Sequence, residues 1–168
     1  YTSKQVAAST GTGDWSSAAS VPVLIREAVV GNMDGFNVQL MSHFSDIITN
    51  GREGALVIQV WNDAMDNLET EYDLKGKTAE LKAIINRFWM PRNTVNKAYK
   101  MDEASANTMK FSQVRIPLEG DDGWGGIVSM DFAMFGGNLA SFLKKEFDII
   151  VKVQPRGLGE VYLILGGK

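Results

Sequence analysis

The stretch that decides the fold lies near the C-terminal end of the chain, where residues 149–165 read IIVKVQPRGLGEVYLIL. Ile149, Val151 and Val153 alternate with Asp148, Lys152 and Gln154, although Ile150 interrupts the polar face. A second apolar run follows at 161–165. Alternation with a period of two is typical of a strand with one face on a core and one in water. Because Pro155-Arg156-Gly157 is a turn signal, the stretch predicts a β-hairpin with a loop of about five residues.

The same alternation recurs upstream of this hairpin. It is found at 36–40, 114–118 and 128–134, while the runs at 21–30 and 55–61 are more continuously apolar, as in strands covered on both faces. Together with the C-terminal hairpin, these segments predict roughly seven strands.

Two segments have helical spacing instead. Residues 78–89 place Leu81, Ile84, Ile85 and Phe88 on one stripe, with Thr78 as the expected N-cap and Pro91 as the expected stop. A shorter helix is predicted at 138–146, capped by Asn138. Many strands with two helical segments predict a mainly β fold, an antiparallel β-sandwich or jelly roll with one or two short helical insertions.

The first twenty residues differ in composition from the rest of the chain. Ser, Thr, Gly and Ala fill 14 of these positions, and Trp15 is the only large apolar side chain apart from Tyr1 and Val6. Such a stretch buries too little apolar area to offset its conformational entropy. We therefore predict a flexible polar arm at 1–20, followed by a single jelly-roll-like β domain at 21–168.

The composition excludes several kinds of chemistry. The 168 residues contain no cysteine and one histidine, His43, which removes disulfides, thiolate catalysis and zinc sites built from cysteines or several histidines. No apolar run reaches the ~18 residues of a membrane span. Five acids between Asp63 and Asp73 could hold a divalent ion, but solvated loops explain them better. We therefore expect no catalytic residue, no cofactor and no metal site.

Charge is distributed unevenly along the chain, whose net charge is −3. Residues 51–73 carry six acids against one base, whereas residues 74–100 carry seven bases against Glu80. The basic residues are Lys75, Lys77, Lys82, Arg87, Arg92, Lys97 and Lys100. With the aromatic residues Phe88, Trp89 and Tyr99 among them, they could contact RNA phosphates and bases. Alternatively, the two oppositely charged stretches could guide contacts between copies of the protein.

Taken together, the Ser/Thr/Gly/Ala-rich arm, the start at Tyr1, the roughly seven strands and the helical segment 78–89 resemble a known class of protein. The chain is similar in outline to small jelly-roll coat proteins of icosahedral, picorna-like positive-strand RNA viruses. The resemblance carries over no site residue. It implies a capsid subunit of the virion that self-assembles with copies or sister subunits. It also implies genomic RNA as a further partner, no membrane contact and no enzymatic activity.

Two other function classes remain open at this point. A β-sandwich module that binds carbohydrate or another ligand would use Trp61, Trp124 and Tyr162 as a stacking platform, with the loop 121–126 as its rim. A small enzyme of another type would show a deep pocket with titratable groups of shifted pKa.

Overall fold

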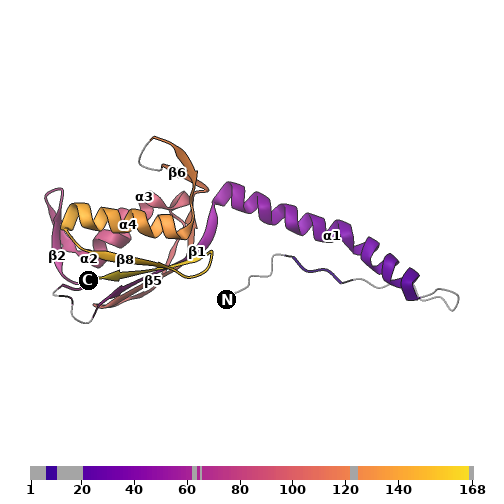
Figure 1. Cartoon of the computed structure of the whole chain (residues 1–168), viewed down its shortest axis with the longest axis horizontal. Helices are drawn as coiled ribbons and strands as arrows, with labels where there is room; N and C mark the ends of the chain where they lie inside the picture. The colour runs from indigo at the N-terminus through magenta and orange to yellow at the C-terminus, as the bar shows by residue number, and fades with distance from the viewer. Residues whose placement is uncertain (1–6, 11–20, 62–63, 65, 122–124, 167–168) are drawn as a thin grey trace. The chain divides into compact units, whose positions relative to one another are not determined.

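The computed structural model describes residues 7–10, 21–61, 64, 66–121 and 125–166. The chain divides into two compact units, Tyr1–Thr49 and Asn50–Lys168. Each unit is described by itself, and Figure 1 shows the elements of both. Apart from residues 7–10, the predicted polar arm lies outside the described residues, as does Trp15.

The first unit is built on one helix, α1 (Val21–Asn50), which is 30 residues long. At 1.5 Å per residue, it extends about 45 Å. The strands predicted at 21–30 and 36–40 are therefore wrong. Within these short windows the residues alternate as they do in a strand. Over a longer range, however, apolar residues such as Val29, Met33 and Phe36 recur every three or four positions, which is helical spacing.

Residues 7–10 contact α1. The amide of Ala8 donates a hydrogen bond to Gln39 Oε1 at 3.0 Å, and the Ser9 hydroxyl donates one to Asn32 Oδ1 at 2.6 Å. The Asn32 amide in turn donates to the carbonyl of Ala28 at 2.9 Å. Polar side chains of α1 thus bind this short segment of the N-terminal region.

The second unit contains a five-stranded sheet in the order β4-β5-β1-β9-β8. Its strands are β1 (Arg52–Val60), β4 (Lys100–Ala104), β5 (Thr108–Ile116), β8 (Val151–Pro155) and β9 (Glu160–Leu165). β1 and β9 are parallel, and the other neighbours are antiparallel. The predicted C-terminal hairpin is confirmed as β8–β9, and the runs at 55–61 and 114–118 fall largely on β1 and β5.

Two further pairs of short strands are present, and one of the four strands overlaps the strand predicted at 128–134. They are β2 (Glu71–Leu74) with β3 (Lys77–Glu80), and β6 (Glu119–Asp121) with β7 (Ile127–Ser129). Lys75 and Gly76 join β2 to β3 with φ of 55° and 76°. Two successive positive φ values are typical of the type I′ turn that closes a tight hairpin. At three or four residues each, these strands are too short for an alternation to show.

The longest helix of the second unit is α4 (Phe132–Phe147). It begins at Asp131, whose carboxylate accepts a hydrogen bond from the Met134 amide at 2.7 Å. The helix predicted at 138–146 is therefore confirmed but starts earlier, and Asn138 is not its cap. The strand predicted at 128–134 is limited to β7, because the strong cap at Asp131 begins the helix there.

A second helical stretch follows β3. It consists of α2 (Leu81–Ala83), the π-helical η1 (Ile84–Trp89), α3 (Met90–Asn93) and the 3-10 turn η2 (Val95–Lys97). The predicted helix at 78–89 is thus displaced, because Thr78 belongs to β3. Pro91 does not stop it, because α3 follows the π-helical η1 without a break: Trp89 and Met90, the two residues before the proline, both keep helical φ and ψ.

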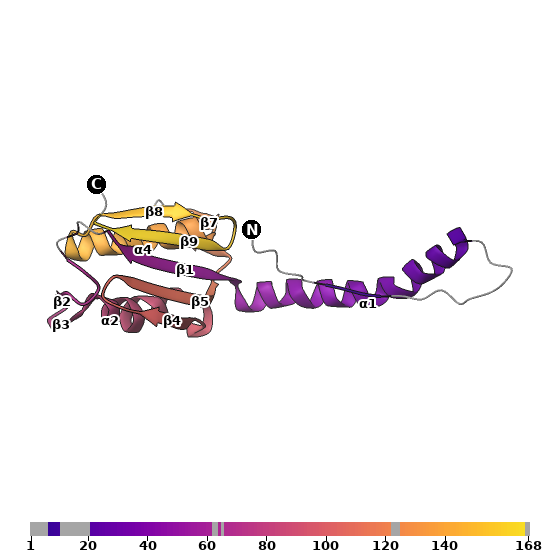
Figure 2. The same ribbon diagram turned by 90° about the horizontal axis from the view of Figure 1, so that it is seen from below.

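The core of the second unit lies between the sheet and these helices. Figure 2 looks at the sheet with α4 and α2 behind it. Leu56, Ile58 and Leu163 of the sheet are fully buried, as are Leu139 and Leu143 of α4. Among the described residues, no helix of this unit covers the opposite face. The prediction of a mainly β fold is therefore confirmed only in part: the unit is partly β, with a mixed five-stranded sheet and more helix than the sequence suggested.

Candidate interaction surfaces

Large apolar side chains are exposed along much of α1. None of its 30 residues is buried. Its exposed large apolar side chains are Val21, Val23, Ile25, Val29, Val30, Met33, Phe36, Val38, Met41, Phe44 and Ile48. Burying one side chain of this size stabilises a structure by about 1.5–3 kcal/mol. A helix with apolar residues on most sides is typically surrounded by other elements. The surface of α1 is therefore that of a helix which packs against others.

One stripe along α1 follows the seven-residue repeat of helices that associate. Its members are separated by four and three residues in alternation: Val29, Met33, Phe36, Leu40, His43 and Ile47. We call these six residues the α1 seam. Val23, Val30 and Phe44 lie beside the seam in the same repeat, so the apolar face is wider than a two-residue stripe. Such a widened face is typical of helices in bundles.

Part of the α1 seam lines a shallow hollow of about 420 Å³. Its walls are Ser9, Ile25, Ala28, Val29, Asn32, Met33 and Phe36. The Ser9–Asn32 hydrogen bond lies at its edge. The seam therefore offers both protruding apolar side chains and a depression between them, which is what the interlocking of side chains between helices requires.

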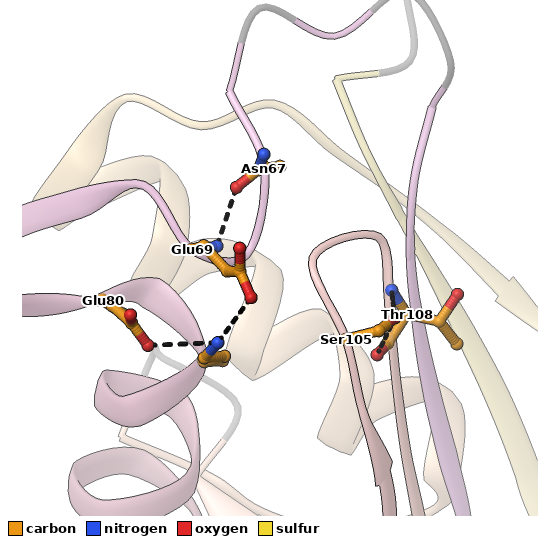
Figure 3. A network of polar contacts seen from close by, with 6 residues as sticks. Asn67, Glu69, Glu80, Ser105 and Thr108 are labelled. Carbon is orange, nitrogen blue, oxygen red and sulfur yellow. Dashed lines mark hydrogen bonds and ion pairs between the residues drawn. The ribbon is translucent and has the colours of Figure 1, made fainter.

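The seven basic residues predicted as contacts for RNA or neighbouring subunits lie in the second unit, from the β2–β3 turn to β4. Two of them are neutralised locally. Lys82 Nζ lies 2.8 Å from a carboxylate oxygen of Glu69 and 3.2 Å from one of Glu80. Figure 3 labels the two glutamates. Lys100 Nζ lies 2.9 Å from Asp102 Oδ1. These two residues therefore add little free positive charge.

The ion pairs of Lys82 also affect its acid–base behaviour. The hydrogen bond to Glu69 raises the pKa of the Lys82 ammonium. Partial desolvation works against this increase, while the contact with Glu80 adds to it. Lys82 is therefore held as a cation by its own neighbours, which suits a structural role in joining the β2–β3 hairpin to α2.

Two other basic residues of this set, Lys75 and Arg92, converge on the ring of Phe88. Arg92 Cζ lies 3.8 Å from the ring centroid, and Arg92 Nη1 donates a hydrogen bond to the Phe88 carbonyl at 2.6 Å. Lys75 Nζ, at the tip of the β2–β3 hairpin, lies 5.5 Å from the same centroid. The remaining three, Lys77, Arg87 and Lys97, are exposed. The sequence identified these charges but not the aromatic ring that holds two of them.

Phe88 begins a row of half-buried rings that sequence reasoning missed. Its ring stacks on Phe142 with centroids 6.0 Å apart, Phe142 meets Phe147 at 5.8 Å, and Phe147 meets Tyr72 at 4.9 Å. The rings come from η1, α4 and β2, so no local sequence pattern unites them. Burial raises the pKa of Tyr72, and the nearby carboxylate of Asp66 raises it further.

The other two aromatic residues of the basic stretch have structural roles. Trp89 is buried and packs edge-on against Phe135, with ring centroids 4.9 Å apart. The Tyr99 hydroxyl donates a hydrogen bond to the Asn86 carbonyl at 2.7 Å, and burial raises its pKa. Trp89 and Tyr99 are therefore used for internal packing, whereas Phe88 is partly exposed and carries Arg92 over its ring.

A second hollow, of about 320 Å³, lies beyond Arg92. Its apolar wall includes Met130 and Phe135, and its polar wall includes Arg92, Asn93, Asn138 and Glu119. The charged residues of its lining are Arg92 and Glu119.

The acidic stretch after β1 is used for local structure where it is described. Asp73 Oδ1 accepts a hydrogen bond from the Gly76 amide at 3.0 Å, and Asp66 accepts one from the Tyr72 hydroxyl at 3.2 Å. Within the described ranges, no three histidine or acidic side chains are grouped as metal ligands. Asp63 lies outside these ranges.

The aromatic platform predicted for a carbohydrate module is only partly described. Trp61 follows β1 and is half exposed, whereas the ring of Tyr162 on β9 is covered by Arg156 at 4.3 Å. Tyr162 pairs with Val57, so about 13 Å of strand separate it from Trp61. Trp124 lies outside the described residues. Trp61 and Tyr162 therefore do not form one continuous stacking surface.

The comparisons with known proteins place the second unit in a family. Residues 52–166 match the family described as a domain of unknown function (DUF6175). The match covers more than half of the chain, so the chain belongs to this family. It begins at the first residue of β1, and α1 lies outside it. No curated protein and no solved structure matches the chain. Among the described helices, none is both long and apolar enough to cross a membrane.

Proposed function

We propose that the chain is a structural subunit that works by self-association, and that α1 holds the copies together. The observation that carries this proposal is the surface of α1, which has exposed apolar side chains along its length and no buried residue. A protein exposes a large apolar surface of this kind where a partner covers it. The function then lies in the surfaces that neighbouring copies bury, and no reactive group is required.

A second copy of the chain is the partner that best fits the α1 seam. In a parallel pair, each seam residue meets the same residue of its partner, so Met33, Phe36 and Leu40 would pack against their counterparts. The helix carries only four charged residues, Arg26, Glu27, Asp34 and Asp46. None of the four belongs to the α1 seam, so charge repulsion within the seam is small. The apolar residues beside the seam favour a bundle of more than two helices.

The test is the mass of the full chain in solution by size-exclusion chromatography with light scattering. We expect a defined oligomer, whose mass is a multiple of 18.4 kDa. The double variant Met33→Glu/Leu40→Glu should reduce the mass to that of a monomer, because it places a ring of carboxylates in the seam. Val38→Glu is the matched control, since Val38 is 68% exposed and lies outside the seam.

Two outcomes would contradict the proposal. One is a monomeric wild-type chain. The other is an oligomer that the seam variant and the control variant leave equally intact, which would place the contact elsewhere. Circular dichroism of each variant shows whether α1 remains helical, so that loss of association can be separated from loss of the helix.

A narrower form of this proposal makes the chain a coat subunit of an icosahedral, picorna-like RNA virus. It is supported by the resemblance of the sequence pattern and by the surface available for assembly, and it places the chain in the virion with copies or sister subunits. The finer jelly-roll arrangement also belongs to this form. Negative-stain electron microscopy tests it: closed particles of uniform diameter support a coat subunit, and small open oligomers only would overturn it.

A ligand-binding module is the second candidate, favoured by Trp61, whose side chain is 50% exposed at the end of β1. A half-exposed indole suits stacking against a sugar ring or another flat ligand. A glycan array with the wild-type chain and Trp61→Ala tests this function. Binding that is lost in the variant would support it, and an array without signal for either protein would reject it.

A further inference from the structure

We propose that the helical layer of the second unit carries a binding strip for single-stranded nucleic acid, centred on Phe88 and Arg92. The strip consists of Tyr72, Phe147, Phe142, Phe88, Lys75 and Arg92, and we call it the Phe88 strip. It continues into the 320 Å³ hollow beyond Arg92. This inference goes beyond self-association, because it names a different partner and uses no residue of α1.

The first support is the way in which Arg92 is held. Arg92 Cζ lies 3.8 Å from the ring centroid of Phe88. Arg92 Nη1 donates a hydrogen bond to the Phe88 carbonyl. An arginine has five N–H donors, so most of them remain for a ligand. Because the side chain is already immobilised, binding a phosphate to it costs less conformational entropy.

The second support is the convergence of positive charge from distant parts of the chain. The tight turn at Lys75 and Gly76 brings Lys75 to the same ring that holds Arg92. Arg87 is exposed and precedes Phe88 in η1. In the part of the chain that the structure describes, no carboxylate forms an ion pair with any of these three cations. Their charge is therefore available to a polyanion, unlike that of Lys82 and Lys100.

The third support is the row of rings beside these charges. Phe88, Phe142, Phe147 and Tyr72 follow one another at centroid distances of 4.9–6.0 Å, and all are partly exposed. The ring of Phe88 is itself occupied, since Arg92 lies over it and Phe142 stacks on it. A base would therefore meet the partly exposed row of rings or stack on the Arg92 guanidinium, while the phosphates meet the cations.

The hollow at the Arg92 end adds groups that could meet a base edge. Asn93 and Asn138 line it from α3 and α4, and Met130 and Phe135 supply an apolar wall. The Asn93 side-chain nitrogen donates to the Trp89 carbonyl at 2.7 Å, which fixes the amide and leaves its oxygen as an acceptor. At about 320 Å³ the hollow is near the lower limit of small-ligand sites, the size of one nucleotide base or somewhat more.

These features favour nucleic acid over an acidic peptide. An acidic peptide would use the cations but would have no need for a row of rings and fixed amides. The second unit carries 15 basic and 16 acidic residues, so its net charge does not attract a polyanion. Binding of nucleic acid would therefore depend on the local positive charge of the Phe88 strip. The π-helical geometry of η1, which presents Arg87 and Phe88, is also a feature found frequently at functional sites.

The experiment measures binding of a fluorescein-labelled oligo(dT) and oligo(U) of about 12 nucleotides to the full chain by fluorescence anisotropy, at about 50 mM and about 200 mM salt. The test variant is Lys75→Gln/Arg92→Gln, and the matched control is Lys152→Gln/Arg156→Gln, which removes the same charge from β8 and the turn after it. We expect the test variant to weaken binding at least tenfold and to lower the salt dependence, and the control to change affinity less than twofold.

Several results would overturn the proposal. They are no binding by the wild-type chain at the lower salt, equal weakening in test and control variants, and displacement of the oligonucleotide by polyglutamate as readily as by unlabelled oligo(dT). The last result would assign the strip to acidic peptides. The oligomeric mass of the same variants is measured in parallel. An unchanged mass with lost binding separates this site from self-association through α1.

Discussion

At the scale of single residues, glycines show where the backbone of the second unit has no space for a side chain. A Cβ on Gly54 of β1 would lie 2.2 Å from the carbonyl oxygen of Gly159 and 2.4 Å from the ring of Phe132. The neighbouring amide of Ala55 donates a hydrogen bond to that same carbonyl at 2.8 Å. Gly54 therefore allows β1, the β8–β9 turn and the start of α4 to meet.

We predict that Gly54→Ala destabilises the protein by about 2–4 kcal/mol, because the carbonyl of Gly159 is backbone and cannot move without breaking its hydrogen bond. Gly137→Ala is the control, since nothing lies within 4 Å of its added Cβ in α4. That variant should gain up to about 1 kcal/mol from helix propensity. Urea denaturation measures the free energy of unfolding of each variant. Equal values for Gly54→Ala and Gly137→Ala would contradict this prediction.

A second prediction at this scale concerns Asp102 on the edge strand β4. A hydrogen bond from Ser112 lowers the pKa of this carboxyl below its usual 3.8, and Lys100 adds to the effect. Because the folded-state pKa is lowered, the stabilisation is present above pH 3.8 and is lost as the pH falls through the lower value. A carboxyl carbon titration by NMR should show a midpoint below 3.8, which Ser112→Ala raises.

The matched control for that titration is Asp148, whose pKa is lowered by Lys144 and which lies far along the chain from β4. Its midpoint should be the same in wild type and in Ser112→Ala. If the Asp102 midpoint lies at or above 3.8 in the wild type, or is the same in Ser112→Ala, then the hydrogen bond from Ser112 does not lower the pKa of Asp102.

At the scale of elements, prediction from sequence succeeded where the signal was local. The β8–β9 hairpin combines two alternating runs with a turn signal between them, and it was predicted correctly. α1 was missed because residues 36–40 alternate with period two inside a longer helical repeat. Helical spacing becomes visible only over the longer range of the α1 seam.

The candidate interaction site shows the same limit. The charge count identified Lys75 and Arg92, but the ring between them and its neighbour Phe142 come from segments far apart in the chain. No pattern within one segment predicts which cations will share a ring. The fold brings them together through the β2–β3 turn, the π-helical η1 and the packing of α4, and none of these was predicted with its correct bounds.

A prediction at this scale uses the two glycines inside α1. Gly31 and Gly35 have open space where a Cβ would lie, so alanine introduces no collision. Each replacement should stabilise the helix by about 1 kcal/mol, because glycine loses more backbone entropy on folding than alanine. Thermal melting of Gly31→Ala/Gly35→Ala, followed by circular dichroism at 222 nm, should show a transition at higher temperature than the wild type. A transition at lower temperature would mean that these glycines allow a close contact between helices.

At the scale of the whole molecule, the family match and the apolar surface fall on different units. The sheet, its helices and the Phe88 strip belong to the segment that matches the family, whereas α1 lies before it. We infer a division of work in which α1 assembles copies and the second unit presents the binding strip. In an oligomer, several strips would act on one strand, which raises the overall affinity without any new contact.

The most direct test of this account is sedimentation equilibrium of the full chain over a hundredfold range of concentration. Assembly through α1 predicts a mass that reaches a fixed multiple of 18.4 kDa at the higher concentrations and falls towards a single chain on dilution. A mass of one chain at every concentration would contradict it, because the apolar surface of α1 would then remain uncovered by any second copy.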